Sequence, residues 1–362
     1  MDWTIRYAPA GVNRRHTEDQ VPFDPRARRS IGRTGLAATA LALGSASLGG
    51  LYRAVAEADA TATVARAWDL GVRLFDTAPL YGYGASERRF GAALASRDRD
   101  AFVLSTKVGR LVRERATIPP DADVDRQRLA DRDDAYYVVK DPLGIVFDYS
   151  ADGTRRSIEE SLERLGLDRV DVALIHDPDD HWEAAIGGAF PALARLRDEG
   201  VVRAIGAGMN QAPMLARFAR EGDFDVFLCA SRYTILDQTA MDELIPACVE
   251  RAASILVGGV MNTGLLADPQ PGTRYDYGAA PPEMIDRARR IAAICEHHGV
   301  SLKAAAVQFP LAHPVVASVV AGVRSVEHLD EYPALMAVPI PGDLWAELRS
   351  EGVIRPDAPV PA

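Results

Sequence analysis

Short apolar runs alternate with amphipathic segments along most of the chain. Eight runs have the length and composition of buried strands, and they centre near Leu43, Leu74, Leu104, Leu174, Ile205, Phe227, Leu256 and Val319. Segments with the helical period lie between them, at 59–70, 86–95, 155–165, 190–199, 212–221, 241–252 and 282–298. A strand followed by a helix, repeated along the chain, predicts a parallel sheet with helical crossovers.

The number of these units distinguishes an open sheet from a closed one. Eight strands in a chain of 362 residues favour an α/β fold of the (β/α)8 barrel type. Several helical patterns are followed by a glycine at the position of a left-handed C-cap, namely Gly71, Gly166, Gly200 and Gly299. These glycines mark where we expect the helices to end.

Two segments between the predicted elements are unusually long. Residues 108–153 follow the third strand and residues 262–282 follow the seventh, and both are rich in Pro, Asp and Tyr. Each segment leaves the C-terminal end of a strand, which is the end where barrel enzymes carry their active sites. We therefore expect both segments to overhang the catalytic mouth, as lids or binding walls.

Polar residues stand where three of the predicted strands end. Asp76, Lys107 and His176 are each the first strongly polar group after an apolar run, and Tyr81 follows Asp76 by five residues. The C-terminal ends of parallel strands converge on one face, so these four side chains are expected to meet. A phenol, an ammonium, an imidazole and a carboxylate in one place indicate proton transfer by a tuned phenol.

Charge and cysteine content exclude several classes of function. The formal net charge of −10 makes nucleic acid an improbable partner. Cys229, Cys248 and Cys295 lie far apart without metal-ligand spacing, so we predict no metal site and a reducing, cytoplasmic location. No apolar run is long enough to span a membrane, and no membrane partner is predicted.

The amino-terminal residues are polar and do not fit the strand–helix pattern. We expect residues 1–28 to form a flexible arm and residues 29–362 to form a single domain. Arg28 and Arg29 precede the apolar stretch 35–48, an order that resembles a twin-arginine export signal. Cleavage of that stretch would delete the first predicted strand, so export is the disfavoured interpretation.

The polar residues and their flanks resemble the aldo-keto reductase family. The segment from Gly71 to Gly82 resembles the family signature, and Ser86-Glu87, Ser105-Thr106-Lys107 and Ile175-His176 follow in the family's order. The resemblance extends from about Ile31 to Pro356. It implies a TIM barrel with an N-terminal β-hairpin and long loops at the C-terminal face. Residues 176–182, 205–211 and 232–238 are similar to the sugar-oxidising branch of the family.

The resemblance also implies catalytic roles. Tyr81 would be the general base, Lys107 would favour its phenolate, Asp76 would hold Lys107, and His176 would orient the substrate. Taken singly, each residue has an ordinary alternative: a rim tyrosine, a solvated lysine or a core histidine. Their joint order and spacing favour the catalytic interpretation.

The family implies a nicotinamide cofactor that lies across the barrel mouth. The glycine-rich stretch 44–50 lacks the G-x-G-x-x-G spacing of a Rossmann fold. The predicted cofactor contacts are instead Asn210, Ser231, Gly322, Arg324, Ser325 and His328. NADP-preferring members carry a Lys, an Arg and an Asn around the extra phosphate, where this chain has Gly322, His328 and Tyr332. We therefore predict NAD, with NADP less favoured.

Candidate substrate residues follow the catalytic histidine. Asp177 takes a position where many relatives carry Trp, and its carboxylate could accept hydrogen bonds from sugar hydroxyls; the alternative is a cap of the turn at Pro178. Tyr52 and Trp182 could be platforms for a ring, or could be packing residues. The predicted substrate is a small molecule, and the sequence makes no prediction of the oligomeric state.

These inferences lead to one expected activity and three alternatives. We expect NAD-dependent oxidation of the anomeric C1 hydroxyl of an aldose such as L-fucose to its lactone. The alternatives are oxidation of pyridoxal, general NAD(P)H-dependent aldehyde reduction, and a non-catalytic role as a cofactor-sensing partner.

Overall fold

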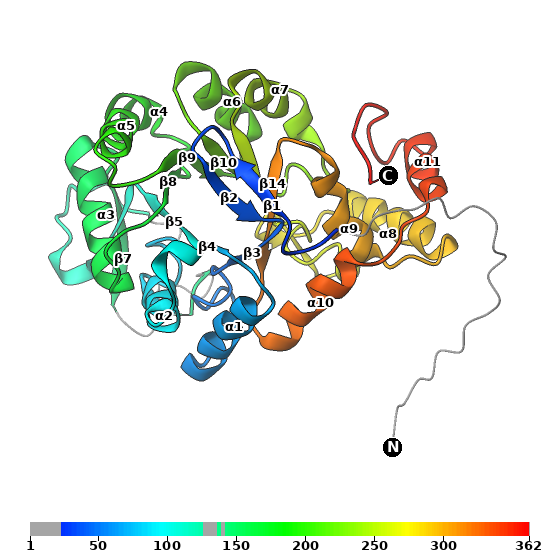
Figure 1. Cartoon of the computed structure of the whole chain (residues 1–362), viewed down its shortest axis with the longest axis horizontal. Coiled ribbons are helices and arrows are strands. Elements are labelled where there is room, and N and C mark those ends of the chain that lie inside the picture. The colour runs from blue at the N-terminus through cyan, green and yellow to red at the C-terminus, as the bar shows by residue number, and fades with distance from the viewer. Residues whose placement is uncertain (1–22, 126–135, 139–141, 362) are drawn as a thin grey trace.

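The computed structural model describes residues 23–125, 136–138 and 142–361 of the chain. Eight parallel strands close into a barrel (Figure 1): β3 (Leu41–Gly44), β4 (Leu74–Asp76), β5 (Val103–Val108), β8 (Val172–His176), β9 (Ala204–Met209), β10 (Val226–Ala230), β11 (Ser254–Gly258) and β14 (Val316–Gly322). Each strand contains the apolar centre that the sequence predicted for it. The (β/α)8 barrel is thereby confirmed.

Helices surround the barrel (Figure 1): α1 (Glu57–Asp69), α2 (Ala85–Leu94), α3 (Ala151–Leu165), α4 (Trp182–Ala184), α5 (Phe190–Asp198), α6 (Ala212–Glu221), α7 (Leu244–Arg251), α8 (Pro282–His297), α9 (Leu302–Gln308), α10 (Val326–Met336) and α11 (Gly342–Ser350). The four predicted C-cap glycines all have positive φ, between 63° and 88°. The helix predicted to begin at residue 155 begins four residues earlier, because the Ser150 hydroxyl caps it by accepting a hydrogen bond from the Gly153 amide.

A β-hairpin closes the N-terminal end of the barrel, as the family resemblance implied. Strands β1 (Arg28–Ile31) and β2 (Leu36–Thr39) pair antiparallel, with Ile31 opposite Leu36. Ile31 and Leu36 are buried and share a cluster with the first residues of barrel strands, such as Leu74 and Val172. The hairpin is therefore a hydrophobic plug, and it leaves the opposite end of the barrel for the site.

The segment before the hairpin lies against the barrel from residue 23 onward. The Phe23 amide donates to the Met336 carbonyl at 3.1 Å, and the Leu41 amide donates to the Pro25 carbonyl at 3.0 Å. Residues 1–22 of the predicted arm lie outside the described residues. The apolar stretch 35–48 contains β2 and β3, so it is part of the barrel.

Both long segments carry a small two-stranded antiparallel sheet at the C-terminal end of the barrel. The first contains β6 (Arg110–Glu114) paired with β7 (Leu143–Phe147), and the second contains β12 (Arg274–Tyr275) paired with β13 (Gly278–Ala279). Residues of both segments line cavities at the barrel mouth, as the sequence predicted. In the described parts of the chain, no helix has the length and apolar character that a membrane crossing needs.

Candidate active site

The predicted carboxylate and ammonium form a buried ion pair at the barrel mouth. Asp76 ends β4 and Lys107 lies in β5, which is paired with β4. Lys107 Nζ lies 2.7 Å from Asp76 Oδ2 and donates to the Thr77 carbonyl at 2.9 Å. Ser105 Oγ donates to the other carboxylate oxygen at 2.9 Å. The position of the Lys107 side chain is thus fixed by residues at the end of β4.

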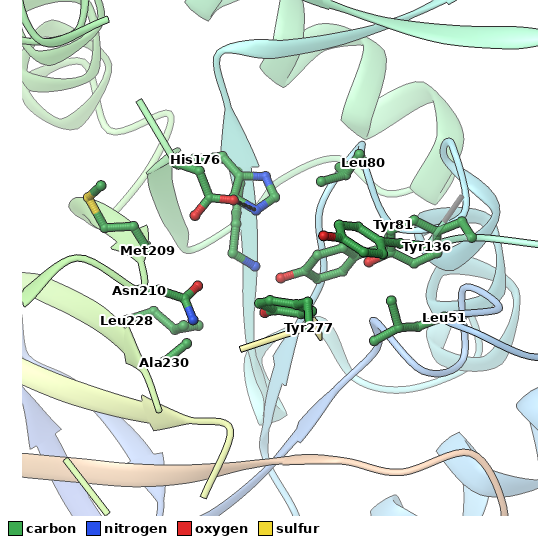
Figure 2. A pocket seen from close by; sticks show the side chains of 14 residues that line it. Leu51, Leu80, Tyr81, Tyr136, His176, Met209, Asn210, Leu228, Ala230 and Tyr277 are labelled. Atoms are coloured by element: carbon green, nitrogen blue, oxygen red, sulfur yellow. Dashed lines mark ion pairs between the residues drawn. The ribbon is translucent and has the colours of Figure 1, made fainter. Parts of the chain in front are cut away.

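Tyr81 lies beside this ion pair, on the turn that follows β4. Lys107 Nζ is 4.6 Å from the centre of the Tyr81 ring, and the His176 ring is 5.7 Å from it at an angle of 88° (Figure 2). Gly82 allows this turn, because its φ is +62° and a Cβ there would come within 2.2 Å of the Gly49 carbonyl oxygen. The four predicted residues are therefore brought together.

The histidine end of the site is held by two residues that sequence reasoning did not single out. The Tyr149 hydroxyl donates to the His176 carbonyl at 2.7 Å, and burial raises the pKa of Tyr149, which keeps it a donor. Arg110 donates to the Asp177 carbonyl at 3.2 Å and pairs with its carboxylate at 3.3 Å. Arg110 also pairs with Asp125 at 2.7 Å. Tyr149 and Arg110 both belong to the first long segment, in which no helical or strand period points to individual residues.

This network fixes an unusual backbone conformation. Asp177 has a φ of +38°, a region that non-glycine residues rarely adopt. Its carboxylate Oδ2 lies 3.6 Å from His176 Nε2. The carboxylate of Asp177 therefore faces the imidazole as well as the guanidinium of Arg110.

These side chains surround a central cavity of about 60 Å³ (Figure 2). Of the predicted residues, its lining includes Tyr81, Lys107, His176, Asp177 and Asn210. Sequence reasoning missed three tyrosines of the wall, which come from the two long segments: Tyr136, Tyr137 and Tyr277. The rings of Tyr136 and Tyr277 lie 5.7 Å apart, so the two segments meet at the mouth.

A larger groove of about 540 Å³ continues from the central cavity and shares the Tyr81 and Tyr277 walls. Its lining includes the predicted cofactor residues Ser231, Gly322, Arg324 and His328. Ser325 does not line it; its hydroxyl caps α10 by accepting from the His328 amide at 3.4 Å. The start of α10, where free backbone amides favour anions, therefore borders the groove.

The groove has the features that a dinucleotide requires. Arg324 and Arg53 both line it, and burial followed by the nearby Arg53 charge lowers the pKa of Arg324. At Gly259, φ is +63° and a Cβ would lie 2.4 Å from the Ser231 hydroxyl, so this wall is built without side-chain bulk. The lack of side-chain bulk at Gly259, the basic side chains of the lining and a helix start suit a nicotinamide ring joined to phosphates, and these residues fit such a cofactor.

Two predicted substrate platforms lie elsewhere. Trp182 lines neither cavity; it is 8% exposed and packs against Phe218 of α6, with ring centres 4.5 Å apart. The short helix α4 turns this side chain into the helix layer. Tyr52 lines the groove rather than the central cavity, and the Arg274 guanidinium lies 4.3 Å from its ring centre.

The cysteines lie in the protein interior. Cys229, Cys248 and Cys295 are free and buried, and burial raises the pKa of Cys229 and Cys295 to about 12. A thiol with such a pKa stays protonated at neutral pH and is a poor nucleophile.

Fold and site together define a nicotinamide-dependent oxidoreductase that acts on CH–OH or carbonyl groups. The model of the aldo/keto reductase family matches residues 40–351, and the chain belongs to this family. It is 46% identical to the D-threo-aldose 1-dehydrogenase of Pseudomonas sp over 88% of this chain and 96% of that protein. It is 41% identical to the pyridoxal 4-dehydrogenase of Microbacterium luteolum, over 90% and 98% respectively.

More distant proteins share the architecture. The chain is 30% identical to the L-galactose dehydrogenase of Arabidopsis thaliana over 84% of this chain and 86% of that protein. Among solved structures, the holo form of an aldo-keto reductase from Bacillus halodurans matches with a TM-score of 0.69 and 24% identity, over 89% and 95% of the two chains. The glycerol dehydrogenase of Gluconobacter oxydans matches with a TM-score of 0.67 and 21% identity, over 92% and 99%. These two structures show the same fold.

Proposed function

We propose that the protein oxidises the anomeric hydroxyl of an aldose such as L-fucose to the lactone, with NAD as hydride acceptor. The observation that carries this proposal is the Asp177 carboxylate, which lines the central cavity beside His176 and Tyr81. A carboxylate in the wall accepts hydrogen bonds from neighbouring hydroxyls, which a sugar supplies and a simple aldehyde lacks. The names of two similar proteins, an aldose and a galactose dehydrogenase, support the same substrate class.

The proton is handled by Tyr81. The Lys107 ammonium lies close to the ring and favours the phenolate, and Asp76 holds the ammonium in place. The phenolate accepts the proton of the anomeric hydroxyl while the C1–H bond breaks with its electron pair. A bound nicotinamide supplies the hydride acceptor. The Tyr81 phenol then returns its proton to solvent, or to a carbonyl oxygen in the reverse reaction.

His176 and Asp177 position the sugar. The His176 imidazole lies 5.7 Å from the Tyr81 ring and lines the same cavity, so a ring nitrogen can donate to the oxygen that Tyr81 deprotonates. Asp177 binds the hydroxyls next to C1. The surrounding tyrosines exclude water and cover the apolar faces of the sugar.

The preference for NAD is supported by the charges of the groove. Gly322 and His328 stand at the positions where NADP-preferring relatives carry a Lys and an Arg. Glu331 and Lys303 also line the groove, and they pair with each other at 2.7 Å, so together they bring no net charge to it. Arg324 and the start of α10 are left for the shared pyrophosphate.

Oxidation of pyridoxal is a second candidate. Its support is the aromatic wall of Tyr136, Tyr137 and Tyr277, which suits a flat pyridine ring, together with the similarity to pyridoxal 4-dehydrogenase. Pyridoxal as a cyclic hemiacetal presents the same CH–OH group to Tyr81 as a sugar does.

A substrate scan tests the proposal. Full-length protein is assayed for reduction of NAD and of NADP with L-fucose, D-arabinose, L-galactose and pyridoxal. We expect the highest kcat/KM with NAD and one of the sugars, and Asp177→Asn should raise KM for the sugar more than for pyridoxal. A preference for pyridoxal that Asp177→Asn leaves unchanged would favour the second candidate, and higher kcat/KM with NADP would refute the cofactor assignment.

A further inference from the structure

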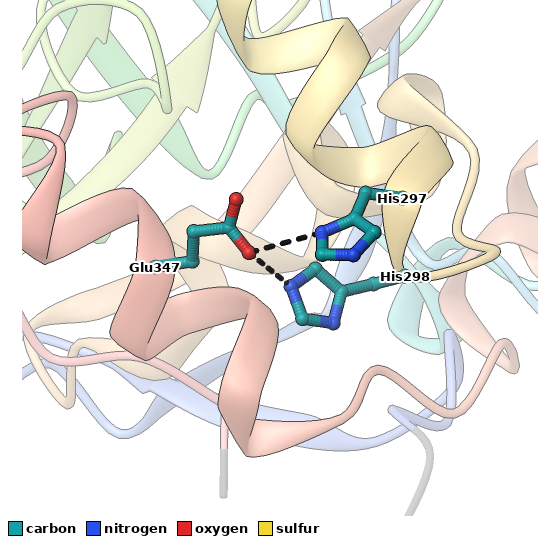
Figure 3. Close-up of side chains that lie close together, drawn as sticks. All are labelled: His297, His298 and Glu347. Carbon is teal, nitrogen blue, oxygen red and sulfur yellow. Dashed lines mark hydrogen bonds and ion pairs between the residues drawn. The ribbon is translucent and has the colours of Figure 1, made fainter.

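Two neighbouring histidines face one carboxylate on the outside of the barrel, away from both cavities (Figure 3). His297 ends α8 and His298 follows it, while Glu347 lies on α11. His297 Nδ1 is 3.3 Å from Glu347 Oε2, and His298 Nε2 is 2.7 Å from the same oxygen. The three candidate ligand atoms lie within 4.8 Å of one another.

The end of α8 makes this convergence possible. Successive residues inside a helix point about 100° apart, so two adjacent histidines would normally diverge. Here the helix stops at His297, and Gly299 reverses the chain with a φ of +68°. The two imidazole rings consequently turn to the same side, with their centres 4.9 Å apart. Figure 3 shows both rings directed at the carboxylate of α11.

The packing of α11 holds the carboxylate in place. Leu344, Trp345 and Leu348 of this helix are buried in the main hydrophobic core. Glu347 lies on the edge of that face, next to the end of α8, and its side chain is 35% exposed. Two structured helices therefore supply the three groups, and Glu347 follows His297 by 50 residues in the sequence.

The donor set is that of a transition-metal site. Two imidazole nitrogens and one carboxylate oxygen suit Zn²⁺, Cu²⁺ or Ni²⁺, whereas Ca²⁺ and Mg²⁺ take oxygen ligands. Ligands about 2.1 Å from a tetrahedral zinc ion lie about 3.4 Å from one another. The separation of His297 Nδ1 from Glu347 Oε2 is already 3.3 Å, the His298 contact of 2.7 Å would open slightly, and the two imidazole nitrogens lie within 4.8 Å of each other.

The surroundings favour a cation. The carbonyl end of a helix carries partial negative charge, and α8 is 16 residues long. The side chain of His297 is 72% exposed, so a water molecule can reach the open side as a fourth ligand.

We propose that His297, His298 and Glu347 bind one divalent transition-metal ion of the Zn²⁺ class, which ties α11 to α8. The site stands apart from the catalytic chemistry, and the proposal is independent of the sugar-oxidising function. Sequence spacing did not point to it, because a pair of adjacent histidines lacks the usual ligand spacing and the third ligand lies on another helix.

Metal titration of the full chain, purified without a histidine tag and treated with chelator, tests the proposal. We expect Zn²⁺ to bind with one ion per chain in calorimetry, and Co²⁺ to give the visible absorption of a nitrogen-ligated four-coordinate ion. His298→Ala and Glu347→Gln should each weaken Zn²⁺ binding by at least about tenfold. His181→Gln is the matched control, since His181 is paired with Asp123 but has no neighbouring histidine in the sequence.

Thermal unfolding provides a second readout. Zn²⁺ should raise the melting temperature of the unaltered protein and of His181→Gln, because an ion that binds the folded chain stabilises it. His297→Ala removes a mostly exposed side chain, so this variant remains folded even where a change at His298 disturbs packing, and it should lose the effect. The absence of saturable binding, or equal Zn²⁺ affinity in His297→Ala and the unaltered protein, would overturn the proposal.

Discussion

At the scale of single residues, the site depends on a cation that is kept out of water. Lys107 is 1% exposed, and its charge is balanced by Asp76 at 2.7 Å. A buried ion pair contributes little net stability, but the loss of one partner leaves an uncompensated charge. The pair is therefore best understood as a device that holds an ammonium beside the Tyr81 ring.

Replacement of Tyr81 tests the general base. Tyr81→Phe removes one hydroxyl and leaves the ring, so the fold and the dissociation constant for NAD should stay close to those of the unaltered protein. Turnover should fall by about 10²–10⁴-fold, the contribution of a positioned acid–base group. Steady-state kinetics and a cofactor titration measure the two effects, and near-normal kcat would remove Tyr81 from this role.

Replacement of Asp76 tests the balance of charge. Asp76→Asn leaves Lys107 buried without its carboxylate and should lower the free energy of unfolding by about 3–5 kcal/mol. Chemical denaturation measures the change. Asp330→Asn, which breaks a half-exposed pair with Arg66, is the control and should cost less than about 1 kcal/mol. Equal losses in the two variants would contradict the buried-pair argument.

The sequence predicted residues at strand ends better than residues in loops. Asp76, Lys107 and His176 follow apolar runs, and parallel strands bring such ends together whatever the connecting loops do. Tyr277 gave no comparable signal, because its place depends on how a loop folds back over the mouth. For Trp182 the sequence left two interpretations open, and the packing interpretation is the one observed, because a short helix directs the side chain against α6.

At the scale of elements, strand β6 supports the site through direct contacts with Asp177. Arg110, at its start, joins the Asp177 carboxylate and backbone to Asp125. The positive φ of Asp177 costs free energy, and the contacts of Arg110 and Tyr149 compensate for it. The first long segment therefore positions His176 and Asp177 as well as walling the cavity.

Replacement of Arg110 tests this positioning. Arg110→Met should lower kcat/KM for the sugar by up to about 10²-fold, because a small displacement of the orienting groups is costly. Arg113→Met on the same strand is the matched control; its partner Glu160 lies on α3, outside the central cavity, so kinetics should change little. Similar kinetics in the two variants would show that Arg110 does not position the site.

Helix predictions failed where amphipathic contrast was weak. Nothing in the predicted set corresponds to α9, α10 or α11. Of the seven residues of α9, Ala304 to Gln308 are all buried, so the segment lacks the polar face that a periodic pattern requires. Pro333 interrupts the pattern within α10. Tertiary packing, rather than local period, defines these elements.

At the scale of the whole molecule, the hydrophobic plug and the catalytic site lie at opposite ends of one barrel. The β1–β2 hairpin fills the N-terminal end, and the catalytic groups line the C-terminal end. Alternation of strands and helices was enough to predict this barrel from the sequence, because eight repeated units leave few other topologies. The hairpin itself followed from the family resemblance.

Replacement of a residue in the hairpin plug tests whether the plug contributes to stability and not to catalysis. Ile31→Ala should lower the free energy of unfolding by about 2–5 kcal/mol, since Ile31 is fully buried, while kcat at a temperature well below unfolding stays unchanged. Arg33→Ala in the same hairpin turn breaks an exposed pair with Asp223 and should cost less than about 1 kcal/mol. A large loss of kcat in folded Ile31→Ala would contradict the separation.

The most direct test of the central claim is the pH dependence of kcat for sugar oxidation in Lys107→Met. The rate should rise with pH as the Tyr81 phenol loses its proton, and without the ammonium this rise should move to higher pH. The double variant Asp76→Asn/Lys107→Met, which leaves no buried carboxylate uncompensated at this position, should show the same displacement. A pH profile that is identical to that of the unaltered protein in both variants would contradict the account.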